Sequence, residues 1–255
     1  MTIEHLIVSA SDQAQITCRF YPPSSEQKGV VIIASAMGVA QDYYAPLALW
    51  LSEKGFLVAT FDYRGTGDSL KGSLRGFQAD LFDWAKDCSA VLAELEMRAL
   101  SKPVYWIGHS LGGQIVPFVE NIGAVSKVIT IASGSGYWLE NAWPLKRRVW
   151  WFWFLVVPLA LPLFGYFPGK RLRKVGDVPK GVMAQWRRWC LDPEYCVGSE
   201  GASLRKKFAE IEMPIVSLAF EDDEMMSRRN IESLHDFFVN APVRMLRIEP
   251  ADVEA

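Results

Sequence analysis

Short runs of apolar residues alternate with longer amphipathic stretches along most of the chain. Nearly continuous apolar runs are typical of strands that are buried on both faces of a parallel sheet, whereas strict alternation is typical of strands with one wet face. Six runs therefore predict buried strands, at residues 30–35, 56–63, 104–108, 128–132, 214–220 and 243–248.

Helical spacing of apolar residues separates these runs. It is clearest at residues 81–95, and it also predicts helices at 44–51, where Gly55 is placed to end the helix, and at 228–240. Strands that alternate with helices indicate an α/β fold, a mostly parallel sheet flanked by helices. Two early runs predict an antiparallel hairpin at one edge of this sheet, at residues 5–8 and 16–20.

Composition narrows the class of protein. The chain has 255 residues, of which 50% are hydrophobic and 22% are charged, enough for one large domain with a substantial core. A net charge of −2 does not predict a nucleic-acid partner. The four cysteines form no CxxC pair, which argues against a zinc site or disulfide scaffold and fits a reducing cytoplasm. The first residues lack the pattern of a signal peptide.

The sequence GHSLGG at residues 108–113 is the candidate for nucleophilic chemistry. It matches the pattern G-x-S-x-G, with a predicted buried strand before it and a helix after it. Small residues two positions before and after Ser110 let strand and helix approach closely, so that the hydroxyl stands clear of the sheet. The amide of Leu111 then lies at a helix N-terminus, where it can stabilise an oxyanion. A tight structural turn is the alternative, and Pro117 should kink the helix that follows.

This motif and the stretch DYRGTGDS at residues 62–69 together resemble the α/β-hydrolase superfamily. The resemblance covers nearly the whole chain, and the pattern is similar to that of bacterial α/β-hydrolases with a lid inserted after the sixth strand. It implies a second oxyanion donor in the loop after the first parallel strand, where the backbone amide of Met37 occupies the donor position. Residues 62–69 are expected to shape a loop beneath the site.

The resemblance also implies an acid after a late strand and a histidine after the last strand, in the order Ser, Asp or Glu, His. Asp223 fits the acid position best and Asp222 is the second choice. No histidine follows residues 243–248 in this sequence. Either a histidine lies beyond the sequence, or the protein has lost acyl transfer. In both cases the chain as given is expected to be a poor hydrolase, because the serine lacks a base.

Three histidines are present, and none is expected to replace the missing base. His5 precedes the sheet. His109 is the variable residue of the elbow, so the turn sets its direction. His235 lies on an apolar face of the last predicted helix, which is the usual position of a packed core histidine.

One segment differs from the rest in composition. Residues 141–176 contain seven Lys or Arg and no Asp or Glu, and seven of the ten tryptophans lie within Trp138–Trp189. Residues 149–167 carry no charge, and basic clusters flank them at 146–148 and 170–174. Nineteen uncharged residues are long enough for a membrane span.

The order of the site residues argues against a span. Ser110 precedes the segment and Asp223 follows it, so a crossing helix would put them on opposite sides of a bilayer. We therefore expect a helical lid at residues 137–203, above an α/β-hydrolase core made of residues 1–136 and 204–255. Peripheral contact with a membrane through Trp and Lys or Arg is an alternative to an ordinary cap.

The sequence thus predicts a cytoplasmic serine hydrolase of the esterase or lipase kind. Its expected substrate is a small molecule, a carboxylic ester or thioester with an apolar acyl group, and no cofactor or metal is expected. Two other functions stay open. One is a catalytically dead, hydrolase-like binding or scaffold protein, and the other is a lipid-handling protein at a membrane surface.

Overall fold

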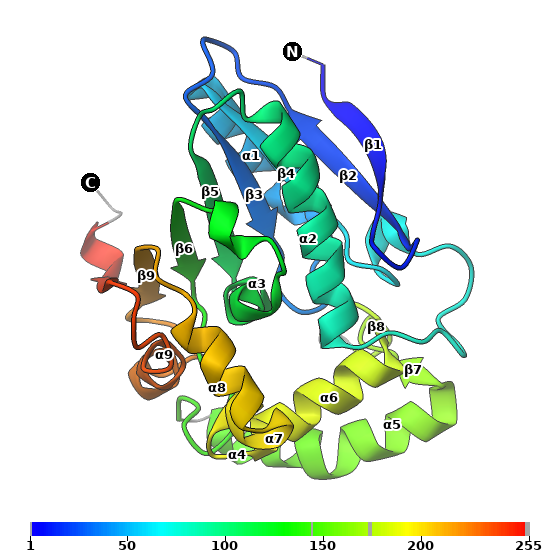
Figure 1. The fold of residues 1–255 in the computed structure, drawn as a ribbon. Helices are drawn as coiled ribbons and strands as arrows, with labels where there is room; N and C mark the ends of the chain where they lie inside the picture. Colours follow the sequence, from blue (N-terminus) through cyan, green and yellow to red (C-terminus); the bar gives the residue numbers. More distant parts are fainter. Residues whose placement is uncertain (1, 144, 173–174, 253–255) are drawn as a thin grey trace.

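The computed structural model describes residues 2–143, 145–172 and 175–252. An eight-stranded sheet runs through its centre (Figure 1). The strands of the sheet are β1 (Glu4–Ser9), β2 (Gln15–Tyr21), β3 (Gly29–Ala34), β4 (Phe56–Phe61), β5 (Val104–His109), β6 (Lys127–Ile131), β9 (Ile215–Phe220) and β10 (Val243–Ile248). They lie in the order β1-β2-β4-β3-β5-β6-β9-β10.

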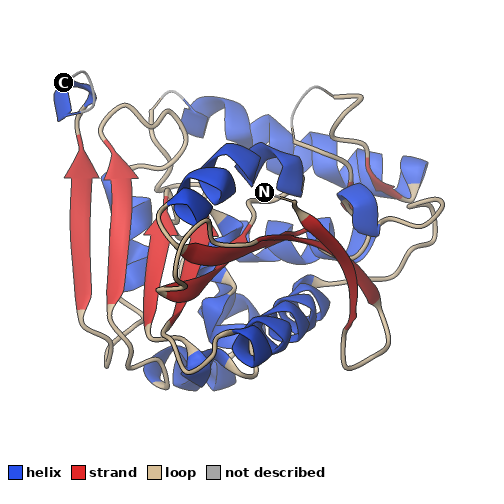
Figure 2. Cartoon of the chain, turned by 90° about the horizontal axis from the view of Figure 1, so that it is seen from above, coloured by secondary structure: helices blue, strands red, loops and turns tan. Residues whose placement is uncertain are grey.

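The predicted fold class is confirmed. The pairs from β4 to β10 are parallel, whereas β1 and β2 form an antiparallel hairpin at one edge, as the two early apolar runs predict. Each of the six longer apolar runs overlaps a strand of the sheet. Viewed from above, the sheet is twisted from one edge to the other (Figure 2), as expected for strands of L-residues.

Nine α-helices accompany the sheet in the described part of the chain. They are α1 (Ala45–Glu53), α2 (Leu81–Arg98), α3 (Leu111–Gln114), α4 (Leu145–Trp151), α5 (Val157–Phe164), α6 (Lys180–Leu191), α7 (Tyr195–Glu200), α8 (Ala202–Ala209) and α9 (Arg228–His235). A short ribbon of β7 (Tyr166–Phe167) and β8 (Val178–Pro179) lies between α5 and α6.

The central strand β3 shows why the apolar runs are uninterrupted. Val30 and Ile32 face a core that also contains residues of α2, whereas Val31 and Ile33 face a second core that contains Ala48 of α1. Both faces of the strand are therefore buried. The long helix α2 begins at a capping box in which the side chain of Asp80 accepts hydrogen bonds from two backbone amides of the first turn.

Two of the predicted helices end early. The predicted helix at 228–240 ends at His235, because the chain then turns so that Phe237 and Phe238 pack against Phe208 of α8. The helix after the elbow ends at Gln114 and gives way to a 3-10 turn that contains Pro117. The predicted disruption at this proline is thus observed.

The loop that follows β4 is held by buried polar groups. The carboxylate of Asp62 accepts hydrogen bonds from the backbone and side chain of Gln41 and from the Asp68 amide. Arg64 bonds to the buried Asp87 at 2.7 Å and to Asp12 of the β1–β2 turn. Burial raises the pKa of Asp87 to about 7, against the pull of the Arg64 charge. These contacts support a structural role for residues 62–69.

Residues 132–214, between β6 and β9, carry α4 to α8 and the β7–β8 ribbon. In Figure 1 these helices lie beyond the ends at which β3, β5 and β6 point. The insertion is attached to the core by hydrogen bonds from Gly176 N to Gly38 O and from Tyr195 Oη to Gln114 Oε1. Arg173 and Lys174 of the second basic cluster lie outside the described residues.

Among the described residues, the helical stretch Leu145–Phe164 is long and apolar enough to cross a membrane, judged by length and composition alone. It runs through α4, one π-helical turn (Phe152–Val156) and α5. Its mean hydropathy is 1.3, and 28% of its apolar window is buried.

The close approach of β5, α3 and β3 gives a stability prediction. A Cβ atom at Gly112 would lie 2.0 Å from the carbonyl oxygen of Ala34, which is backbone and cannot rotate away. We expect Gly112→Ala to lower the free energy of unfolding by about 1–3 kcal/mol or more, as overpacking does. Gly123→Ala is the control, since no atom lies within 4 Å of its Cβ position. Equal midpoints in urea unfolding for the two variants would contradict this view of the elbow.

Candidate active site

Ser110 lies on the turn between β5 and α3, as predicted. Its backbone angles, φ 49° and ψ −110°, fall in a region that non-glycine residues rarely occupy. Two hydrogen bonds from the neighbouring strand region hold it there: Ser110 N donates to Ile131 O at 2.8 Å, and Ser133 Oγ donates to Ser110 O at 2.9 Å. The side chain of Ser110 is half-buried. The fold thus fixes this residue in a strained conformation at the centre of the sheet.

The glycines of the motif make this turn possible. A Cβ atom at Gly108 would lie 2.3 Å from Gly112 O, so strand and helix are in direct backbone contact. The indole of Trp106, a residue of β5, donates to the same Gly112 carbonyl at 2.9 Å. Bulkier residues at either glycine would push the helix away from the strand.

Several backbone amides near the elbow have no hydrogen-bond acceptor within the described part of the chain. They include the amides of Met37, in the loop after β3, and of Leu111, at the start of α3. The amide of Ala36, by contrast, donates to Tyr44 Oη at 2.9 Å. Since β3 and β5 are adjacent parallel strands, both free amides lie at the same edge of the sheet. Backbone amides that have no acceptor at this edge of the sheet can donate hydrogen bonds to an oxyanion.

Asp223 and Asp222 follow β9, two strands away from β5. Asp222 is exposed, and Asp223 is half-buried. One oxygen of Asp223 accepts hydrogen bonds from the amides of Met225 and Met226, at 2.7 and 2.9 Å. Its charge acts to raise the pKa of His109. A cavity of about 260 Å³ opens beside it, between β9, β10 and α9.

One ring nitrogen of His109 is hydrogen-bonded to Tyr44. The Tyr44 hydroxyl accepts the amide hydrogen of Ala36, so its own hydrogen can be donated to His109 Nδ1, 2.9 Å away. This arrangement favours a neutral ring that carries its hydrogen on Nε2. Burial also lowers the pKa of His109, which outweighs the opposing effect of Asp223. His109 is therefore tied, through Tyr44, to the loop after β3.

His235 is a core residue. It is buried, its Nδ1 bonds to Ile231 O at 2.7 Å, and its Nε2 bonds to Thr130 Oγ1 at 2.9 Å. His5 is exposed on β1, at the far edge of the sheet. Within the described residues, no hydrogen bond connects Ser110 Oγ to any histidine.

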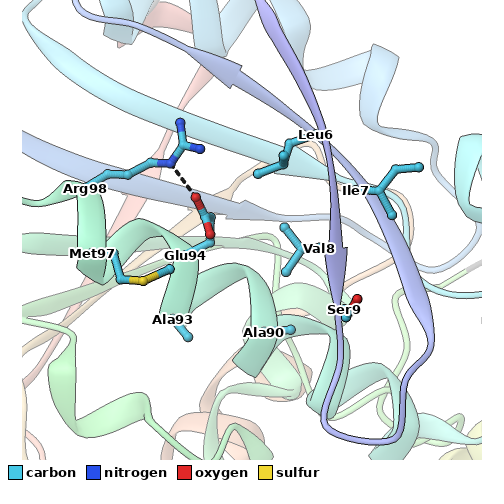
Figure 3. A pocket seen from close by; sticks show the side chains of 9 residues that line it. All are labelled: Leu6, Ile7, Val8, Ser9, Ala90, Ala93, Glu94, Met97 and Arg98. Atoms are coloured by element: carbon cyan, nitrogen blue, oxygen red, sulfur yellow. Dashed lines mark hydrogen bonds and ion pairs between the residues drawn. The ribbon is translucent and has the colours of Figure 1, made fainter.

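A second groove, of about 420 Å³, lies between β1 and α2 (Figure 3). Its walls are mainly aliphatic, with an ion pair between Arg98 and Glu94 at one end. None of the residues that line it belongs to the elbow or to the loop after β9. This groove is therefore separate from the Ser110 site.

Tyr44 and Ser133 are site residues that the sequence did not indicate as such. Tyr44 fixes both Ala36 and His109, and Ser133 supports the strained turn. Tyr44 was recognisable only as part of a helix face. The contacts of Tyr44 and Ser133 depend on which strands are neighbours in the sheet, so a local sequence pattern cannot predict them.

The parallel sheet with its strained serine between β5 and α3 places the protein in the α/β-hydrolase class. Within this class, the model of the family described as "Serine aminopeptidase, S33" matches residues 25–164, more than half of the chain, and the protein belongs to this family.

Solved structures share this fold at low sequence identity. A thermostable carboxyl esterase from Bacillus coagulans is 13% identical, with a TM-score of 0.66 over 98% of this chain and 91% of the esterase. A monoglyceride lipase from Saccharomyces cerevisiae is 17% identical, with a TM-score of 0.69 over 98% of this chain and 86% of the lipase.

A closer match in sequence is local. Over 75 residues, 28% of this chain, the sequence is 43% identical to lysophosphatidylserine lipase ABHD12 of Bos taurus, and the same identity holds for the protein of Gallus gallus. The match spans 16% of the bovine protein and 17% of the chicken protein. These similarities agree with a hydrolase of the esterase or lipase type.

The buried position of His235 predicts a pH-dependent stability. Burial lowers its pKa below the ordinary 6.5, so the unfolded chain binds the proton more readily than the folded one. The contribution of neutral His235 to the free energy of unfolding is fully present above pH 6.5. It is lost as pH falls, by at most about 1.4 kcal/mol per pH unit. We expect His235→Gln to flatten the unfolding free energy between pH 7.5 and 5, measured by urea titration. His5→Gln, on exposed β1, should keep the wild-type slope; an unchanged slope in His235→Gln would contradict the assignment.

Proposed function

We propose that the protein cleaves a carboxylic ester or thioester with an apolar acyl group, with Ser110 as nucleophile. The observation that supports this most directly is the conformation of Ser110, at φ 49° and ψ −110°, next to the uncommitted amide of Leu111. Surrounding contacts must compensate backbone strain of this kind. Here those contacts hold the hydroxyl of Ser110 at the end of the sheet. A merely structural turn would not need a serine there.

The proposed reaction uses the groups in a fixed order. Ser110 Oγ forms a bond to the carbonyl carbon of the substrate, its proton passes to a base, and the carbonyl oxygen takes the electron pair. The amides of Met37 and Leu111 then donate hydrogen bonds to this oxyanion. Collapse of the intermediate expels the alcohol or thiol, which takes up the proton, and water releases the acid from the acyl-serine.

The missing component of this proposed site is the general base for Ser110. Asp223 is the proposed acid, which would orient a histidine positioned between it and Ser110. Nδ1 of His109 bonds to Tyr44, and both ring nitrogens of His235 bond to other groups. We therefore propose that the 255-residue chain acts slowly, because general-base catalysis contributes about 10²–10⁴-fold to such reactions.

The insertion supports the choice of an apolar acyl group. We interpret residues 137–203 as a lid, since Gly176 N bonds to Gly38 O at 2.9 Å, one residue from the proposed oxyanion donor Met37. The inner side of the insertion is rich in aromatic side chains, such as Trp153 and Phe167, both buried. The likeness to a monoglyceride lipase and, locally, to a lysophosphatidylserine lipase favours the same class of ester.

A catalytically inactive binding protein is the second candidate. The commitment of His109 and His235 to other partners favours it, because a fold with no base near its serine can still bind an acyl ester. It would retain affinity for apolar esters and show no turnover.

The two candidates differ in serine reactivity. We expect a fluorophosphonate to label the protein slowly and only at Ser110, with a rate that rises when imidazole is added as an external base. Ser110→Ala should abolish labelling, and Ser126→Ala, at an exposed serine, should leave it unchanged. Mass spectrometry of the intact protein over time measures both rates, and a p-nitrophenyl ester of medium chain length measures turnover.

Two outcomes would contradict the proposal. Labelling that persists in Ser110→Ala would exclude Ser110 as the reactive residue. Fast turnover without imidazole that disappears in His109→Ala would show that His109 serves as the base after all. No labelling of the wild-type protein under any condition would favour the inactive binding protein.

A further inference from the structure

The outer side of the helical stretch Leu145–Phe164 is apolar and open to solvent. Side chains spaced four residues apart form two parallel rows along it, and no charged residue interrupts them. We call this surface the outer face; its exposed residues are Trp150, Trp151, Phe154, Leu155, Pro158, Leu159, Pro162 and Leu163. Leu159 is 60% exposed and Leu163 is 69% exposed.

The opposite side of the same stretch is also apolar. Val149, Trp153, Val157 and Leu161 are buried in the core of the protein. Trp153 packs edge-on against Trp186 of α6, and Arg187 Nε donates to the Trp153 carbonyl at 2.6 Å. A helix that is apolar all round is expected inside a protein or in contact with hydrocarbon. Helix α6 covers one side of this stretch. The outer-face side chains stay exposed among the described residues, even Phe154, whose ring meets Trp138 at 5.8 Å and lies 6.0 Å from the Arg187 guanidinium.

Basic residues stand at both ends of the outer face. Lys146, Arg147 and Arg148 lie at its start, and Lys170 and Arg171 follow its end. None of these five forms an ion pair with a described residue, and no acidic residue occurs between positions 141 and 176. Two of them lie over aromatic rings instead: Arg147 over Trp143 at 5.6 Å, and Arg171 over Phe164 at 5.5 Å.

We propose that the outer face docks flat on an anionic phospholipid bilayer. Aromatic and leucine side chains would enter the boundary between headgroups and acyl chains, and the two basic ends would contact the lipid phosphates. The buried contacts of Trp153 with α6 hold the stretch against the folded core, so it lies on the membrane and does not cross it.

Charge argues against a second copy of the chain as the occupant. Because both ends of the outer face are basic, either a parallel or an antiparallel pairing of two copies would bring like charges together. An anionic surface complements both ends at once. This proposal does not depend on the chemistry of Ser110.

Co-sedimentation with vesicles tests the proposal. We expect the full chain to pellet with vesicles in which phosphatidylglycerol makes up about one third of the lipid, and to bind pure phosphatidylcholine at least about ten-fold more weakly, with added salt reducing the difference. The double variant Leu159→Glu and Leu163→Glu should lose at least about ten-fold in affinity. Arg147→Glu with Arg148→Glu should weaken binding to anionic vesicles only.

The matched control places the same charges elsewhere. Met97→Glu with Val239→Glu alters side chains that are 72% and 70% exposed and lie outside the outer face, and it should bind as the wild type does. Circular dichroism and urea unfolding check that each variant is folded. Ser110→Ala should also bind normally, so a failure of the proposed hydrolase would leave this result intact.

Two results would overturn docking on a bilayer. One is unchanged vesicle binding by the Leu159→Glu and Leu163→Glu variant. The other is a wild-type dimer in analytical ultracentrifugation that this variant converts to a monomer without any vesicle binding, which would assign the outer face to contact between copies.

Discussion

The direct backbone contact between β5 and α3 is the constraint on which the candidate site depends. Gly108 and Gly112 allow the helix to begin immediately against the strand, and Gly112 also touches the carbonyl of Ala34 on β3. Such an abrupt reversal forces Ser110 to a positive φ. The same reversal leaves the amide of Leu111 without an acceptor, because it is the first amide of a helix. The proposed nucleophile and one proposed oxyanion donor are thus consequences of one geometric feature.

Hydrogen bonding around the elbow explains why the histidines of the chain do not complete this site. Tyr44 ties the loop after β3 to His109, so the ring next to Ser110 helps to position the proposed oxyanion loop. His235 forms a hydrogen bond with the side chain of Thr130 in the core. The neutral, buried ring of His235 makes a hydrogen bond at each nitrogen and so stabilises the fold. The same two hydrogen bonds keep this ring from taking part in proton transfer.

Much of this architecture could be predicted from local pattern. The buried strands appear as uninterrupted apolar runs, and the elbow appears as small residues around a serine between a strand and a helix. Contacts across the sheet could not be predicted, since Tyr44 and His109 are 65 positions apart and meet only because β3 and β5 are neighbours. The end of α9 at His235 depends on the packing of Phe238 against Phe208, which apolar spacing alone does not reveal. For Leu145–Phe164, the sequence shows that both sides are apolar, and only the fold shows which side is open.

A crystal structure of the protein after reaction with a fluorophosphonate would test the central claim most directly. If Ser110 is the nucleophile and the amides of Met37 and Leu111 form the oxyanion site, the phosphorus will be bonded to Ser110 Oγ. Its free oxygen will then lie about 2.7–3.1 Å from both amide nitrogens. A phosphonate attached to another residue, or an adduct on Ser110 whose oxygen faces solvent away from both amides, would contradict this assignment.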